Sequence, residues 1–371
     1  MNNYHGIIFA YKSYPELREL VSERTAASLP ICSRYRLIDF ALSSLRNAGI
    51  VDVGVIMQRD YQSLLDHLGS GKPWDMSRRT GGLRMLPPFG LPLHHKGDYS
   101  GTIEALNSVS SYIEDIPKKY IVLMIGNLCA NINLREVCRV HEQSDAEITA
   151  VCANYEPDVL HNRYVVGEDG YVMQVLFDRT GPSQGSMPAL ECYIINKDTL
   201  LRMMDRCRAL DKYRFHQDVI TMFLREGGKM GTYIHRTYAR VIKDVDGYYA
   251  ANMDLLNPVN RNSLFPASRP VRTKLESGVS TYYGTEAVSK NSLVADNCII
   301  EGSLENCIVF TGVHVGKGAV LKNCIIMKDG VVGNDTHLDY VIADKDVTFS
   351  SNLAITGTQR LPIVVPKGSE V

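Results

Sequence analysis

The sequence predicts an α/β protein, in which a Rossmann-like, mostly parallel sheet precedes a left-handed parallel β-helix of hexapeptide repeats. Short apolar runs such as "GIIFA", "VDVGVIM" and "YIVLMIG" alternate with helical patterns in the first two thirds of the chain. Such runs are typical of strands covered on both faces, and alternation with helices indicates parallel strands joined by crossovers. Beyond about residue 280, apolar residues recur every six positions, as in a β-helix.

Local patterns support the α/β part. A leucine-rich stretch over residues 61–68 is spaced for one face of a helix. The run "RYVVGEDGYVMQVLF" predicts a hairpin that turns at residues 168–170.

The domain boundaries follow from a change in composition. Residues 257–272 are rich in Pro, Asn and Ser and predict a linker. We therefore expect a first domain over residues 1–256, a linker over 257–279 and a β-helix over 280–371.

The hexapeptide region contains two repeated themes. One predicted column, broken by His337, has six-residue spacing and contains Val313, Ala319, Ile325, Val331 and Ala343. The second theme, "NCII", "NCIV" and "NCII", begins at Asn297, Asn306 and Asn323. An irregular all-β domain with chance periodicity is the alternative. A hexapeptide acyltransferase would need an exposed catalytic His, for which only His314 and His337 are candidates.

Composition excludes several classes of protein. The chain has 371 residues, 45% hydrophobic and 22% charged, which suits a two-domain globular protein. A net charge of −1 favours neither a nucleic-acid partner nor a membrane partner. The nine cysteines form no CxxC pair, so we expect free thiols in a reducing cytoplasm. No signal peptide and no apolar stretch approaching 18 residues are present, so a cytoplasmic location is expected.

Longer motifs carry a family resemblance. The segments "YRLIDFALSSLRNAGI", "VIMQRDYQSLLDHL", "SGTIEAL" and "DGYYAANMDLL" occur in order along nearly the whole chain. Together they resemble the bacterial ADP-glucose pyrophosphorylase (glucose-1-phosphate adenylyltransferase) family, and most of all its divergent, non-catalytic D-type subunits. The resemblance implies a nucleotidyltransferase sheet. It also implies a catalytic partner subunit, with a heterotetramer as the expected assembly.

The expected phosphate-binding loop departs from this family. Active members carry "GGxGTRL", whose glycines let backbone N–H groups cradle phosphates. The glycines of this motif align with Tyr11, Lys12 and Tyr14, and its arginine aligns with Glu16. That last change places an anion where a cation would face a triphosphate.

Three further catalytic parts are changed. The family's "RAKP" lysine aligns with Ala26, and its magnesium-binding aspartate aligns with Asn127. A neutral amide is a poor Mg²⁺ ligand. The sugar-phosphate lysine of "EKP" has Arg179 as a candidate replacement, although a gapless alignment places Asp178 there. We expect no cofactor for the isolated chain, and Mg²⁺ only with residual activity.

Other positions match the family's substrate pocket. The nucleotide end is expected to contain Gln58, Gly101 and Thr102. The sugar-phosphate end is expected to contain Tyr248, Asn252 and Asp246, the last also a candidate metal ligand. Each of these residues is equally explained by packing. Asp218 also matches a family aspartate, with helix capping as the alternative.

Arg24 and Arg36 match cationic positions of the family's effector pocket, between the catalytic domain and the β-helix. Paired arginines suit an anionic effector such as a sugar phosphate or phosphate. Surface salt bridges are the alternative.

These departures predict a regulatory, catalytically impaired subunit. Nucleotidyl transfer needs Mg²⁺ and cations to hold developing charge, and loss of one such stabiliser costs about 10²–10³ in rate. The alternative is a slow but active adenylyltransferase in which Lys12, Arg34 or Arg179 supplies the charge. A binding module without a pyrophosphorylase partner is a third hypothesis.

Overall fold

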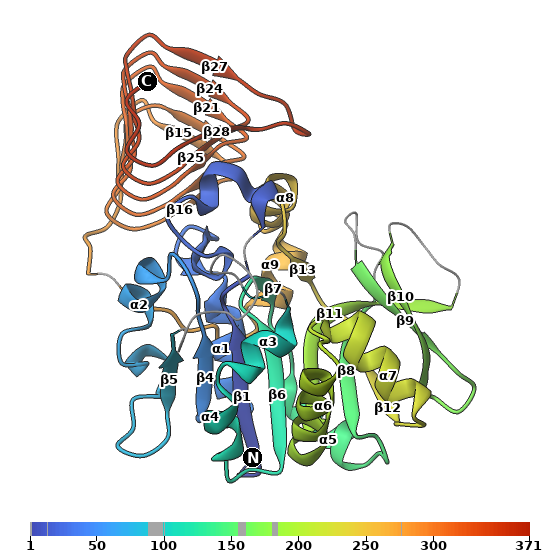
Figure 1. Ribbon diagram of the computed structural model, residues 1–371. Helices are drawn as coiled ribbons and strands as arrows, with labels where there is room; N and C mark the ends of the chain where they lie inside the picture. The colour runs from blue at the N-terminus through green and yellow to red at the C-terminus, as the bar shows by residue number, and fades with distance from the viewer. Residues whose placement is uncertain are drawn as a thin grey trace.

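The computed structural model describes residues 2–12, 14–87, 99, 101–154, 161–179, 185–275 and 277–371, except for the side chains of residues 178 and 179. An N-terminal α/β domain lies beneath a C-terminal stack of parallel coils (Figure 1). The predicted fold class is therefore confirmed.

The α/β domain contains one large sheet. Its strands are β1 (Tyr4–Phe9), β4 (Val53–Ile56), β5 (Leu83–Leu86), β6 (Tyr120–Ile125), β8 (Ile148–Ala153), β9 (His161–Val166), β10 (Val172–Arg179), β11 (Ser186–Asn196) and β12 (Met230–His235). The order is β10-β9-β11-β6-β1-β4-β5, with β8 between β11 and β12. Strands β6, β1, β4 and β5 are parallel, whereas β11 is antiparallel to β6 and β8. The three predicted apolar runs form β1, β4 and β6, all fully buried.

Helices and two small sheets surround this sheet. The helices are α1 (Ile38–Asn47), α2 (Gln62–Leu68), α3 (Thr102–Asn107), α4 (Ser110–Glu114), α5 (Leu134–Glu142), α6 (Lys197–Ala209), α7 (Thr221–Arg225), α8 (Val245–Asp254) and α9 (Pro258–Leu264). The shorter turns are η1 (Pro15–Val21), η2 (Ala26–Ser28), η3 (Lys72–Trp74) and η4 (Phe215–Ile220), the last a π-helical turn. The small sheets pair β2 (Pro30–Ile31) with β3 (Tyr35–Arg36) and β7 (Leu128–Ala130) with β13 (Ala239–Val241).

The predicted helix and hairpin are also confirmed. Helix α2 presents Leu64 and Leu68 to the core. Strands β9 and β10 pair antiparallel, and Gly170 between them has a φ of 82°. No helix in the described part of the chain combines the length and apolarity needed to cross a membrane.

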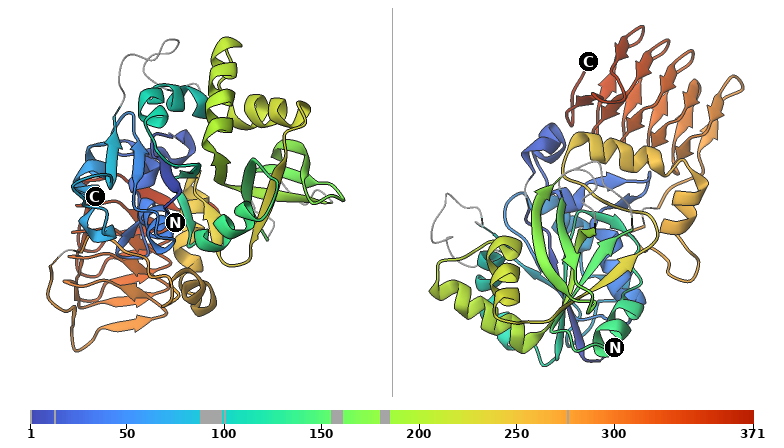
Figure 2. Two further views of the ribbon diagram at one scale, coloured as in Figure 1. Left: turned by 90° about the horizontal axis from the view of Figure 1, so that it is seen from below. Right: turned by 90° about the vertical axis from the view of Figure 1, so that its right-hand side faces the viewer.

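The C-terminal domain consists of three parallel sheets that form the faces of a β-helix (Figure 2). One face contains β14 (Tyr282–Tyr283), β17 (Ile299–Ile300), β20 (His314–Val315), β23 (Val331–Val332) and β26 (Thr348–Phe349). The second contains β15 (Val288–Lys290), β18 (Ser303–Glu305), β21 (Val320–Lys322), β24 (His337–Asp339) and β27 (Ala354–Thr356). The third contains β16 (Leu293–Val294), β19 (Ile308–Val309), β22 (Ile325–Ile326), β25 (Val341–Ala343) and β28 (Ile363–Val365).

The repeated Asn-Cys motif forms two corners of the β-helix: Asn306 and Asn323 precede β19 and β22 of one face, whereas Asn297 precedes β17 of another. Asn297, Asn306 and Asn323 all have positive φ, which Asn tolerates better than most residues. The Asn306 amide donates to Asn323 Oδ1 of the next coil at 3.3 Å. The cysteine after each Asn is buried. The motif therefore turns the chain at a corner and places a small thiol in the core.

The predicted six-residue column is not continuous, because the coil from β20 to β23 spans 17 residues instead of 18. Val331 and Val332 lie one coil further along and pair with His314 and Val315, respectively. Val332 is buried and Val331 is 38% exposed. A one-residue slip exchanges the inner and outer faces of a strand, so Val331 points outward rather than into the predicted column.

The segment predicted as a linker contains helix α9. The Asn257 side chain accepts a hydrogen bond from Val259 N at 2.9 Å, and Pro258 occupies the first helical turn. Asn followed by Pro is a helix-starting pattern. Richness in Pro and Asn therefore indicated a helix start here, not an irregular segment.

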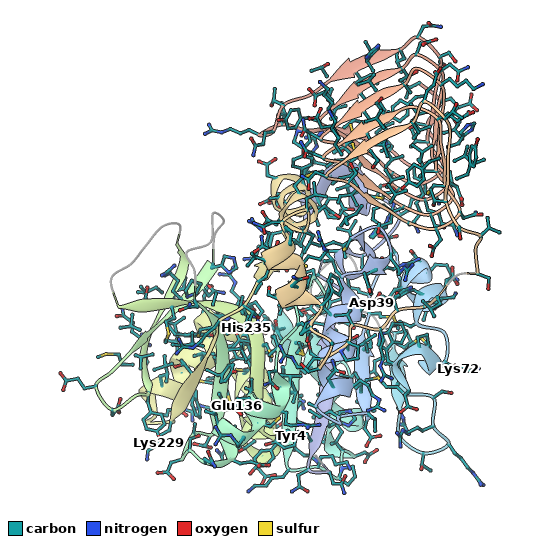
Figure 3. The ribbon with its side chains drawn as sticks, turned by 180° about the vertical axis from the view of Figure 1, so that it is seen from behind. Tyr4, Asp39, Lys72, Glu136, Lys229 and His235 are labelled. Carbon is teal, nitrogen blue, oxygen red and sulfur yellow. The ribbon has the colours of Figure 1, made fainter. Side chains whose placement is uncertain are left out.

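An apolar cluster joins the two domains. It brings Leu17 and Leu20 of η1 and Tyr248 of α8 against Ile325 and Ile342 of the β-helix. All five side chains are fully buried. Figure 3 shows the side chains that fill the space between the domains, with Asp39 of α1 below them. The β-helix is therefore packed on the α/β domain.

A buried ion pair crosses the same boundary. Arg24, which follows η1, pairs with Asp344, which follows β25. Their side chains are only 5% and 1% exposed. Arg24 Nη1 is buried and has no hydrogen-bond partner among the described residues, so Asp344 is the main compensation for this charge.

We predict that Asp344→Asn lowers the free energy of unfolding by about 3–5 kcal/mol, because it leaves the buried Arg24 charge uncompensated. Urea denaturation measures this change. The matched control is Asp296→Asn, which breaks the exposed Arg34–Asp296 pair at 2.8 Å and should cost less than about 1 kcal/mol. Equal small effects of both substitutions would contradict the prediction.

Candidate functional site: two cavities of different charge

The main cavity lies where parallel strands of the sheet end. Lys12 follows β1 and Gln58 follows β4, so both lie beyond the carboxyl ends of neighbouring strands. Open α/β sheets bind ligands at this edge. The cavity has a volume of about 510 Å³ and is lined by Tyr11, Lys12, Tyr14, Pro15, Gln58, Tyr99, Gly101, Thr102, Asn162, Arg214, Phe215, His216 and Gln217.

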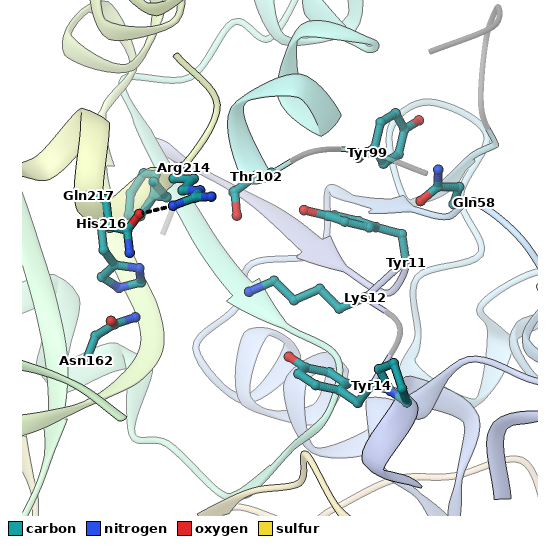
Figure 4. A pocket seen from close by; sticks show the side chains of 13 residues that line it. Tyr11, Lys12, Tyr14, Gln58, Tyr99, Thr102, Asn162, Arg214, His216 and Gln217 are labelled. Atoms are coloured by element: carbon teal, nitrogen blue, oxygen red, sulfur yellow. Dashed lines mark hydrogen bonds between the residues drawn. The ribbon is translucent and has the colours of Figure 1, made fainter. Parts of the chain in front are cut away.

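Side chains of the glycine-free loop enter this cavity (Figure 4). Tyr11 is buried, and its ring packs edge-on against Tyr99 with 5.0 Å between ring centroids. Burial raises the pKa of Tyr11 to about 12. The Lys12 side chain points between the rings of Tyr11 and Tyr14 toward His216 and Asn162. Aromatic and cationic side chains therefore occupy space that a glycine loop would leave open.

The other altered catalytic positions lie beside the cavity or outside it. Glu16 is exposed on η1, and Ala26 is buried beside a second, smaller cavity of about 120 Å³ that Arg24 also lines. Asn127 is 2% exposed, and its amide donates to Ile242 O at 2.6 Å. Burial raises the pKa of Tyr14.

The three residues predicted for the nucleotide end all line the main cavity. They are Gln58, Gly101 and Thr102. Gly101 is required by a close approach: a Cβ atom there would lie 2.2 Å from Tyr213 O. The backbone that leads into Arg214 and the rest of the cavity wall therefore packs directly on Gly101.

A charged cluster lies at the inner end of the cavity. Glu191 is 3.9 Å from Lys12 Nζ and 3.4 Å from His216 Nε2. The Asn162 amide donates to Glu191 at 3.4 Å. Burial alone would raise the pKa of Glu191, but His216, Lys12 and Lys243 lower it to about 2. Glu191 is therefore a carboxylate at neutral pH.

Hydrogen bonds hold His216 in this cluster. The Tyr193 hydroxyl lies 2.7 Å from His216 Nε2 and 3.0 Å from the Tyr164 hydroxyl. His216 belongs to the π-helical turn η4, a type of turn that is frequent at functional sites. Asp218 of the same turn accepts from Tyr213 N and Arg214 N, which matches the capping alternative.

Sequence reasoning missed several cavity residues, namely Tyr99, Asn162, Glu191, Arg214, His216 and Gln217. One signal was available, because Glu191 is the single charged residue in the run "PALECYIIN" of a buried strand. A lone charge in such a run indicates a partnered or functional group. The other residues come from three separate segments: Tyr99, Asn162 in β9, and the run from Arg214 to Gln217 at η4. They could not have been grouped from the sequence.

The residues predicted for the sugar-phosphate end do not meet in the main cavity. Tyr248 and Asn252 are fully buried in α8, between the two domains. The Tyr248 hydroxyl donates to Pro30 O at 2.5 Å, and Asn252 Oδ1 accepts from Cys32 N at 3.0 Å. Asp246 is exposed on the first turn of α8. The side chain of Arg179 lies outside the described residues.

The residues present do not fit a magnesium site. Among the described residues, no three His, Cys, Asp or Glu side chains are grouped so as to hold a metal ion. Asn127, the candidate from the family pattern, donates its amide to Ile242 O at 2.6 Å. Asp246 lies on an exposed helical turn. We therefore derive no chemical step through Mg²⁺.

A third cavity, of about 520 Å³, lies between the α/β domain and the β-helix. Its basic lining residues are Arg34, Arg36, Lys274, Lys328 and Lys345, and its acidic ones are Asp66 and Asp296. Burial, followed by the charges of Arg36 and Arg24, lowers the pKa of Lys345 to about 8. The two predicted effector residues thus border different cavities: Arg36 lines this one, and Arg24 lines the small one.

Comparisons with known proteins agree with this architecture. Residues 15–168 match the nucleotidyl transferase family model, and residues 278–360 match the GlmU-like C-terminal hexapeptide model. The chain is 32% identical to the glycogen biosynthesis protein GlgD of Bacillus subtilis over 99% of this chain and 96% of that protein.

The chain belongs to the glucose-1-phosphate adenylyltransferase family. It is 29% identical to the glucose-1-phosphate adenylyltransferase of Acetivibrio thermocellus, over 89% of this chain and 78% of that enzyme. It is 31% identical to the Geobacillus stearothermophilus enzyme, over 82% and 80% of the two chains. The resemblance seen in the sequence motifs is confirmed.

We predict that Gly101→Ala lowers the free energy of unfolding by about 1–3 kcal/mol, because the new methyl group must push the Tyr213 backbone away. Thermal or urea unfolding measures the change. Gly231→Ala is the matched control, since its Cβ would lie 3.5 Å from the nearest atom, an ordinary contact. A Gly101→Ala protein as stable as the Gly231→Ala protein would disprove the close-approach argument.

Proposed function

We propose that this chain is a regulatory, catalytically impaired subunit of ADP-glucose pyrophosphorylase that acts in glycogen biosynthesis by modulating a catalytic partner. The observation that carries the proposal is the loop after β1. Tyr11 and Tyr14 fill the space of a phosphate cradle with rings, and no glycine is present between residues 11 and 17. Gripping a triphosphate needs exposed backbone N–H groups and cations.

Two further features support low activity. The position of the metal-binding aspartate is Asn127, a buried amide bonded to Ile242 O. The lysine position is Ala26, a small apolar side chain. Each lost electrostatic stabiliser costs about 10²–10³ in rate, with strong non-additivity between them. The alternative is a slow adenylyltransferase in which Lys12 supplies charge, but Lys12 already pairs with Glu191.

A regulatory role needs a site that a signal molecule can occupy. We assign this role to the basic cavity at the domain boundary, whose lining contains five cationic residues and two acidic ones. An anion such as phosphate or a sugar phosphate matches its charge. Because both domains line it, an occupied cavity would alter how the β-helix sits on the α/β domain. A regulator acts by such differential contacts in two states.

The first test mixes the chain with the catalytic glucose-1-phosphate adenylyltransferase of the same organism. We expect the isolated chain to turn over more than about tenfold slower than the partner, since it lacks transition-state stabilisers. The mixture should elute earlier than either protein and respond differently to phosphate than the partner alone. Comparable turnover by the isolated chain, or a mixture with unchanged rate and elution, would refute the proposal.

Sulfate binding tests the basic cavity, because sulfate keeps its charge between pH 7 and 9. Lys345 has a pKa of about 8 and loses its proton as the pH rises through that value. The affinity for sulfate, measured by calorimetry, should therefore fall by up to about tenfold between pH 7 and pH 9. Lys345→Met should bind more weakly at pH 7 and show little pH dependence. A pH-independent affinity of the unsubstituted chain would contradict the assignment.

A further inference from the structure

Glu191 occupies an unusual backbone position in strand β11. The strand has a register shift between Ala189 and Cys192, and Glu191 within it has a φ of 53°. Its neighbours Leu190 and Cys192 are fully buried. A left-handed conformation strains a residue other than glycine, and such outliers gather at functional sites. A bulge of this kind re-aims a side chain, and here it directs a carboxylate toward the main cavity.

The carboxylate meets basic groups from three other segments. Lys12 comes from the loop after β1, His216 from η4, and Lys243 from the segment before α8. Asn162 of β9 adds an amide donor at 3.4 Å. Both Glu191 and Lys12 also line a small void behind the cavity, next to Phe9 and Phe215. Without Glu191, these groups would form an anion site at the inner end of the cavity.

We infer that Glu191 is a built-in counter-anion that occupies this inner anion site. Its charge lowers the affinity of the cavity for ligands that carry a phosphate group. The side chain is only 11% exposed, so water screens its charge weakly. A ligand phosphate at the same place would meet like-charge repulsion, and the charge of Lys12 would already be compensated by Glu191.

Displacement of the carboxylate offers no easy route for an anionic ligand. Glu191 would have to leave its bonds to Lys12, His216 and Asn162 while still inside the protein, and an unpaired buried charge is costly. An uncharged ligand would not be repelled by the Glu191 carboxylate. It would meet the rings of Tyr11 and Tyr99, the amides of the cavity wall and a neutralised inner end.

This inference concerns the inner end of the cavity and does not depend on a partner subunit. The glycine-free loop lowers the affinity for a triphosphate, whereas Glu191 lowers the affinity for a ligand with a single phosphate group. The test therefore uses the isolated full-length chain and two probes that differ by one phosphate, glucose 1-phosphate and glucose. Glu191→Gln keeps the shape and removes the charge, whereas Glu191→Gly removes the carboxylate and relieves the backbone strain.

We expect both substitutions to increase the affinity for glucose 1-phosphate by at least about tenfold, because the Lys12 ammonium then becomes available to the phosphate. Affinity for glucose should stay within about twofold, since no ionic term changes. Calorimetry or ligand-observed NMR gives both values. Adding Lys12→Met to Glu191→Gln should reverse the gain, which locates the phosphate beside Lys12.

Glu305→Gln is the matched control. Glu305 lies 3.9 Å from Lys322, the same separation as in the Glu191–Lys12 pair, but on the surface of the β-helix. The Glu305→Gln substitution should change the affinity for neither glucose 1-phosphate nor glucose.

The Glu191→Gln variant could fail to fold, since it removes a buried charge. In that case Glu191→Gly provides the test, because the positive φ of position 191 favours glycine. Folded variants without a selective gain for glucose 1-phosphate would overturn the inference, as would an unsubstituted chain that binds this probe equally tightly. Either result would leave the mixing experiment with the catalytic subunit unaffected.

Discussion

The burial of Leu17 and Leu20 is the constraint on which the two-domain architecture depends. Both residues lie in η1, directly after the loop that follows β1, and both pack in the cluster that receives the β-helix. Backbone N–H groups of this segment are used inside its own turns, as in the bond from Leu17 N to Tyr14 O. A segment packed in this way supports the β-helix.

Packed side chains also determine the shape and charge of the main cavity. Where glycines would leave room for phosphate groups, Tyr11 and Tyr14 contribute rings that line the cavity. At the inner end, Glu191 pairs with Lys12 and contacts His216. Under the proposals above, both ends of the cavity lower its affinity for polyanions. Loss of the loop alone would weaken binding, and the internal carboxylate adds selection against anions.

Positive charge is concentrated instead at the domain boundary. Arg36 and Lys345 belong to different domains and line one cavity, and the proximity of like charges together with burial lowers the pKa of Lys345. Arg24 lies nearby, but its guanidinium forms an ion pair with Asp344. Anion binding there would act directly on the contact between the domains. On the proposed function, this boundary is therefore where the chain would sense an anion.

The sequence alone determined the fold class, most elements and the family, because these depend on local periodicity and on motifs read along the chain. It also predicted one shared pocket for Gln58, Gly101 and Thr102, and all three line the main cavity, since each lies near the end of a strand or the start of a helix at the sheet edge. Motif matching failed for Tyr248, which lies in the interdomain core although its motif is intact.

Only the tertiary structure decided the chemistry of the cavity. Glu191, Lys12 and His216 are far apart in sequence, and no local pattern reveals that a strand bulge turns one carboxylate toward two basic groups. The partner of Arg24 was equally hidden, because Asp344 is 320 residues away. Charge compensation depends on distances of a few ångströms between distant segments, and packing of the whole chain sets those distances.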